Sequence, residues 1–141
     1  MKLQTASETI SFGRELEEQA AKFCEEMAIK FPEKADVLNA FAKENRKFHA
    51  QIQRAYQSVI TDAIEGCYAF NLESDNFQLD TQVPEKLADA VKKALDIEEI
   101  LLDFYDVGAE QSMSLMADVP RNFKLVAKKR RARLAKLQAL A

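Results

Sequence analysis

Four segments of this chain space their apolar residues three and four positions apart, and a single polar residue interrupts each apolar stripe. In AVKKALDIEEILLDFY (90–105), Glu98 lies on the face that also carries Leu95, Leu101 and Leu102. Residues at this spacing share one face of an α-helix, so Glu98 is predicted to point into the apolar side. The four interrupting residues are Glu17, Asn45, Glu98 and Arg130. Because each lies near the middle of its segment, we expect a polar layer at one level of a helical bundle.

The sequence predicts an all-α fold in a single domain, 1–141, with helices roughly over 11–31, 34–65, 85–116 and 120–139. Only three glycines and three prolines occur, which is too little turn material for an all-β fold. Ser11 is the expected cap of the first helix and Pro32 its stop. Gly66 is expected to end the second helix, and Pro120 suits the first turn of the fourth.

The crossover 67–84 is long for a loop inside one domain. Such a length is needed where consecutive helices run in the same direction, and an extended chain of this size spans roughly 60 Å. The two other connections are short, which predicts antiparallel helical hairpins. We therefore expect two hairpins joined by one long crossover.

Composition restricts the possible partners and compartment. The sequence has no apolar run long enough for a membrane span, and Cys24 and Cys67 form no metal-binding or redox motif, which favours a cytoplasmic protein. Eight Lys or Arg and no acid follow position 120; subtracting them from the net charge of −3 leaves −11 for residues 1–120. The basic run suits either one helix packed on acidic neighbours or, as a weaker alternative, nucleic acid.

Two helical segments share one spacing of residues. In DIEEILLDFY (96–105), Glu98 precedes Tyr105 by seven residues, and an aromatic residue comes directly before the tyrosine. In ELEEQAAKFC (15–24), Glu17 has the same relation to Cys24. These motifs resemble the rubrerythrin branch of the ferritin-like superfamily. The resemblance covers most of residues 10–137 and implies a ferritin-like four-helix bundle with a degenerate internal duplication.

The resemblance also implies a Glu-x-x-His motif on the second helix of each hairpin, and both motifs are missing. In FAKENRKFHA (41–50), Asn45 and Phe48 occupy the glutamate and histidine positions. In VAKKRRARLA (126–135), Arg130 and Arg133 occupy them. Moving the second helix by one residue brings in His49, but the glutamate position remains unfilled. The vestigial site layer is therefore expected to comprise Glu17, Asn45, Phe48, Glu98, Tyr105, Arg130 and Arg133.

These substitutions predict a protein without catalytic residues or cofactor, in which guanidinium groups pair with the carboxylates through parallel hydrogen bonds. The expected role is structural or in protein interaction, with a homodimer as a possibility taken from the family. The alternative is a residual iron or manganese site formed by Glu17, Glu98 and His49, serving oxidoreductase or iron-handling chemistry. A third reading is a nucleic-acid binder that uses the basic helix.

For several of these side chains a simpler structural interpretation is also open. Glu98 could reach solvent on a rotated helix, and Arg130 and Arg133 could extend to the surface. His49 fits a boundary position better than a ligand. Tyr105 is expected in the core with a partner for its hydroxyl, and Cys24 is expected as a small buried residue.

Overall fold

Four long helices dominate the computed structural model, which describes residues 1–59, 70–112 and 118–140. They are α1 (Ala6–Lys30), α2 (Ala35–Val59), α4 (Leu87–Gln111) and α5 (Asp118–Gln138). The shorter elements are β1 (Lys2–Leu3), η1 (Pro32–Lys34), β2 (Leu72–Glu73) and η2 (Ser74–Phe77). The predicted all-α class is confirmed for the described part of the chain. None of the helices described there is long and apolar enough to cross a bilayer.

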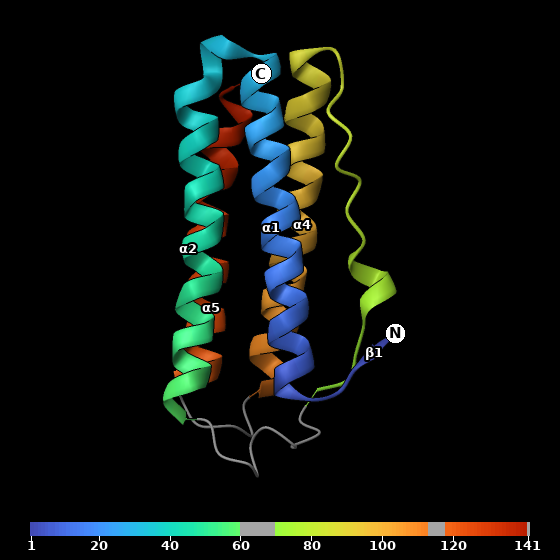
Figure 1. Ribbon diagram of the computed structural model, residues 1–141, viewed down its shortest axis with the longest axis vertical. Coiled ribbons are helices and arrows are strands. Elements are labelled where there is room, and N and C mark those ends of the chain that lie inside the picture. The colour runs from blue at the N-terminus through green and yellow to red at the C-terminus, as the bar shows by residue number, and fades with distance from the viewer. Residues whose placement is uncertain (60–69, 113–117, 141) are drawn as a thin grey trace.

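The helices form a bundle whose course can be followed in Figure 1. Helix α1 rises from the N-terminal end, α2 and α4 descend, and α5 rises again. Helix α1 packs against α2 and α4, and α5 packs against the same two helices, so α1 and α5 lie diagonally opposite. Between α2 and α4, the described segment 70–86 runs along the outside of the bundle.

The start of α1 differs from the prediction. The helix is capped by Thr5, not Ser11: the Thr5 side chain accepts from the Glu8 amide, and the Glu8 carboxylate accepts from the Thr5 amide. This reciprocal capping box satisfies two amides that the first turn leaves free. Ser11 is an exposed residue within the helix. The predicted end holds, because α1 stops at Lys30 and Pro32 opens η1.

The other boundaries agree to within two residues where they can be compared. Helices α2, α4 and α5 begin at Ala35, Leu87 and Asp118, so Pro120 lies in the first turn of α5, where a missing amide costs nothing. The predicted helix ends at 65 and 116, Gly66 and part of the crossover lie outside the described residues. Helix α4 continues past Gly108, as predicted. A glycine suits this position because the Phe123 ring leaves no room for a larger residue: an added Cβ would lie 2.6 Å from ring carbon Cε1.

The described part of the crossover is held at two points. Strand β2 pairs with β1 in antiparallel register, Leu3 opposite Leu72, and this two-residue pairing was not predicted. Farther along, Lys93 Nζ donates to Asp80 at 2.9 Å and to the Gln82 carbonyl at 2.8 Å. The strand pairing thus joins the segment to the N-terminus of the chain, and the Lys93 contacts join it to α4.

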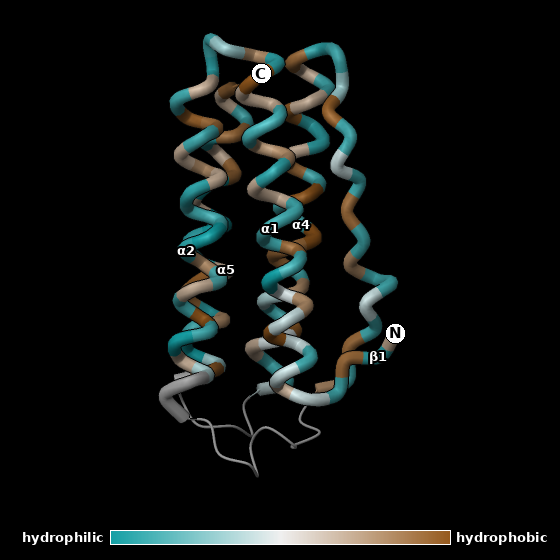
Figure 2. Tube along the Cα trace, in the orientation of Figure 1, coloured by the Kyte–Doolittle hydropathy of each residue, from teal (hydrophilic) through white to brown (hydrophobic). Residues whose placement is uncertain are grey.

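Apolar and polar residues alternate along each helix, as the hydropathy colouring in Figure 2 shows. The apolar residues form the core. One half of the bundle contains a cluster of rings in which Phe104 packs edge-on against Phe12, Phe77 and Tyr105. Phe77 comes from η2, so the crossover contributes to this core. Tyr105 borders the cluster on one side and, through its hydroxyl, the polar residues of the bundle interior on the other.

Candidate functional site

A polar layer lies inside the bundle, and all four helices contribute to it. We use this name for Glu17 of α1, Asn45 of α2, Glu98 of α4, and Arg130 and Arg133 of α5. Each of the five is at most 3% exposed, so every interrupting residue of the apolar stripes points inward. Arg133, for which burial and exposure were both open, is buried as well. Burial of this many charges requires that they satisfy one another.

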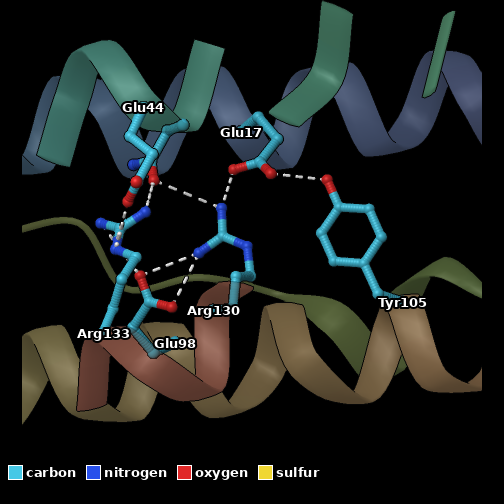
Figure 3. Close-up of polar contacts among 7 residues, drawn as sticks. Glu17, Glu44, Glu98, Tyr105, Arg130 and Arg133 are labelled. Atoms are coloured by element: carbon cyan, nitrogen blue, oxygen red, sulfur yellow. Dashed lines mark hydrogen bonds and ion pairs between the residues drawn. The ribbon is translucent and has the colours of Figure 1, made fainter. Parts of the chain in front are cut away.

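Arg130 connects the two carboxylates of the layer (Figure 3). Its Nη1 donates to both oxygens of Glu98 at 2.8 Å, and its Nη2 donates to Glu17 Oε1. The predicted parallel pair of hydrogen bonds to one carboxylate is therefore wrong in detail, because the two terminal nitrogens serve different carboxylates. Since Glu17 belongs to α1, Arg130 spans the diagonal of the bundle.

Glu17 uses both carboxylate oxygens. While Oε1 accepts from Arg130, Oε2 accepts from the Tyr105 hydroxyl at 2.5 Å, at the short end of the range for hydrogen bonds between oxygens. Tyr105 is buried and its hydroxyl has a partner, as expected. Helices α1 and α4 are thus joined directly as well as through Arg130.

Arg133 completes the layer on the other side. Its Nη1 donates to Asn45 Oδ1, which also lies 3.4 Å from Arg130 Nη2. Its Nη2 lies 3.2 Å from Glu98 Oε1, and its Nε lies 3.4 Å from Glu44 Oε1. Glu44 is partly exposed and places a negative charge at the outer edge of the layer. Sequence reasoning missed this contact, although Glu44 adjoins Asn45 and a long arginine can reach it.

Two phenylalanines lie against the guanidinium groups. The Arg130 Cζ is 5.0 Å from the ring centre of Phe48, and the Arg133 Cζ is 4.5 Å from that of Phe41. A cation over an aromatic face is attracted to the ring electrons, and the attraction strengthens away from water. Phe48 was expected only as the residue at a histidine position of the resemblance. In the structure its ring also stabilises the buried Arg130 guanidinium.

The ionisation of the layer follows from its burial and its partners. Burial raises the pKa of Glu17 to about 7, against the lowering by the Arg130 charge and the Tyr105 hydrogen bond. Burial alone would lower the pKa of Arg130, but Glu17 and Glu98 outweigh it and keep that pKa above its ordinary value. Burial lowers the pKa of Arg133. Burial and the adjacent Glu17 raise the pKa of Tyr105 well above its usual value, so its hydroxyl remains a donor.

His49 and Cys24 lie beside the layer. His49 is half-buried, 2.9 Å from Gln53 Oε1 through Nε2, and lines an open hollow of about 200 Å³ with Arg14 and Glu17. Burial lowers its pKa. Cys24 is buried, which raises the pKa of its thiol to about 11 and keeps it protonated at neutral pH. His49 thus occupies the boundary position expected of it.

The layer offers few groups that could hold a metal ion. Within residues 1–59, 70–112 and 118–140, no three side chains of His, Cys, Asp or Glu come together in a way that could bind one. Guanidinium nitrogens carry no free lone pair, so Arg130 and Arg133 cannot be ligands. The carboxylate oxygens of Glu17 and Glu98 already accept hydrogen bonds from Arg130 and Tyr105.

Comparisons with protein-family models, with curated proteins and with solved structures give no match for this chain. Any assignment of function must therefore start from the residues of the polar layer.

Proposed function

We propose that this chain is a non-catalytic, ferritin-like four-helix protein in which the polar layer replaces a di-iron centre. The single observation that carries the proposal is the position of Arg130, whose two terminal nitrogens bind Glu17 and Glu98 from the interior of the bundle. These are the two carboxylates that the resemblance assigns to the metal site. The guanidinium supplies the positive charge between them.

The charges of the layer support this proposal. When ionised, Glu17 and Glu98 balance the two guanidinium groups. Two divalent cations would need additional carboxylates, and Asn45, Phe48 and Arg133 provide none. Adding metal to the existing arginines would concentrate positive charge in a buried site, which is unfavourable.

A structural role follows from the way the layer is shared among the helices. Rotating any one helix about its axis would withdraw its polar residue and leave a buried partner unpaired, which is costly. The layer therefore favours one rotational setting of all four helices. We propose that the protein acts as a rigid bundle, either as a structural element or as a surface for another protein. A homodimer stays a prediction, to be tested by light scattering.

The decisive experiment measures metal content by mass spectrometry, on protein purified without chelator from cells supplemented with iron and manganese. We expect less than roughly a tenth of a metal ion per chain and no change in melting temperature with Fe(II). Close to one ion per chain with a raised melting temperature would overturn the proposal. It would favour a residual metalloprotein, and Glu17, Glu98 and His49 would then be the first residues to replace.

A further inference from the structure

A small cavity adjoins the polar layer on the side of Arg133. Its volume is about 10 Å³, and its lining includes Ala20, Cys24, Asn45, Ala94, Glu98 and Arg133. All four long helices contribute to this lining. A cavity of this size accommodates one water-sized molecule and nothing larger.

Three donor nitrogens of the lining residues make no hydrogen bond within the described part of the chain: Asn45 Nδ2, Arg133 Nη2 and Arg133 Nε, the last of which lies 3.4 Å from Glu44 Oε1. Asn45 Nδ2 is buried without a partner, since the Asn45 oxygen takes the contacts from Arg130 and Arg133. Arg133 Nη2 lies near Glu98 but makes no hydrogen bond to it. Asn45 and Arg133 are 0% and 2% exposed, so bulk solvent does not reach these groups. Buried donors of this kind normally have a partner, either protein or ordered water.

We propose that this cavity is a binding site for a single structural water molecule. The water accepts hydrogen bonds from Asn45 Nδ2 and Arg133 Nη2 and donates one to the Glu98 carboxylate. Three hydrogen bonds are the usual number for a buried water. The site thereby links α2, α4 and α5 through one shared ligand.

The chemistry of the lining excludes other ligands of the same size. The Glu98 carboxylate repels a halide, and the Arg133 guanidinium repels a metal ion. Asn45 Nδ2 and Arg133 Nη2 can only donate, so an apolar atom would leave both unsatisfied. A neutral molecule that both accepts and donates is required, and in this volume that molecule is water.

The direct test is nuclear Overhauser transfer from water to side-chain amide protons in ¹⁵N-labelled protein. We expect the Asn45 side-chain amide to show transfer of the sign that marks a water bound for nanoseconds or longer. Asn39 on the exposed side of α2 serves as the control and should show only the signature of surface water. An Asn45 amide without transfer from bound water would overturn the proposal.

A matched pair of variants provides a second test under reducing conditions, which prevent a disulfide with Cys24. Ala94→Ser and Ala94→Cys each add one heavy atom toward the cavity, and serine and cysteine have similar helix propensities. The serine hydroxyl can take over the hydrogen bonds of the displaced water, whereas the thiol behaves as a small hydrophobe. We expect Ala94→Cys to melt about 5 °C lower than Ala94→Ser. The reverse order would indicate a dry cavity and would contradict the proposal.

Discussion

Arg130 Nη1 lies 2.8 Å from both carboxylate oxygens of Glu98. This leaves Nη2 free to donate to Glu17 on the opposite corner of the bundle. A guanidinium paired with one carboxylate by two parallel bonds would have joined only neighbouring helices. Because the two terminal nitrogens of Arg130 donate to different carboxylates, this one side chain of α5 is hydrogen-bonded to both α1 and α4. The consequences can be measured as stability and as pH dependence.

Removing Arg130 should be far more damaging than removing a surface cation of the same helix. Arg130→Ala leaves the charges of Glu17 and Glu98 buried with fewer partners, and breaking a buried ion pair from one side costs about 3–5 kcal/mol. Lys128→Ala, at an exposed position of α5, should change stability by less than about 0.5 kcal/mol. Urea unfolding followed by circular dichroism measures both. Equal unfolding midpoints for wild type and the two variants would rule out a buried layer.

The hydrogen bond between Tyr105 and Glu17 should appear as an energetic coupling. Tyr105→Phe removes the hydroxyl that donates to Glu17 Oε2, and hydrogen bonds to charged groups contribute about 1.5–3 kcal/mol. At a pH well above 7, where Glu17 is ionised, the same substitution should cost less in a Glu17→Gln background, because the acceptor is then neutral. A double-mutant cycle isolates this difference. A coupling energy of zero would mean that the contact is not formed in solution.

Glu17 should make stability fall as pH rises through neutrality. Its pKa is about 7 in the folded protein against an ordinary value of 4.5, so between these pH values the folded state holds a proton that the unfolded state releases. The stabilisation that the proton on Glu17 gives the folded state is complete below pH 4.5 and is lost as the pH rises through 7. The full loss amounts to roughly 3 kcal/mol.

The difference between wild type and Glu17→Gln isolates this effect from the other carboxylates. Glutamine keeps the shape of the side chain but does not titrate. The free energy of unfolding of the variant should therefore rise relative to that of wild type from pH 4.5 to about 7.5. Glu15→Gln, on the exposed side of α1, controls for the substitution itself. A stability difference that stays constant over this range would show that Glu17 does not titrate there.

The inward direction of the polar layer could be predicted because helical spacing alone determines which residues share a face. Glu98 and Asn45 interrupt apolar stripes, and both are buried. The partners of Arg133 could not be predicted in the same way. The neighbours that a long side chain contacts are set by packing. The contact of Arg133 with Glu44 and its position over Phe41 therefore depend on the distance between helices.

The start of α1 has a local signal in the sequence, because Thr5 and Glu8 have the spacing of a capping box. By contrast, β1 and β2 contain two residues each, which is too short for any alternating pattern. Their pairing depends on where the crossover returns to the bundle, and that is a property of the assembled fold.

Four substitutions should convert the polar layer into a metal centre if the proposed ferritin-like layout holds. In ferritin-like di-iron proteins, two helices each supply a glutamate and the other two each supply a Glu-x-x-His motif. In the layout that we propose for this chain, Glu17 and Glu98 take the two single-glutamate positions. The combined substitutions Asn45→Glu, Phe48→His, Arg130→Glu and Arg133→His place this motif on α2 and α5. We expect this variant to bind about two Co(II) ions per chain and to melt at a higher temperature when loaded.

Two controls make this result specific. Wild type should bind no Co(II), because Arg130 and Arg133 supply charge without lone pairs. Adding Glu98→Ala to the four substitutions should abolish binding of at least one ion, because it removes a carboxylate of the centre. If the four-fold variant is helical by circular dichroism yet binds no metal, its side chains do not converge as a di-iron site requires. That outcome would separate the polar layer from a ferritin-like origin and leave the ion network as an independent solution to packing four helices.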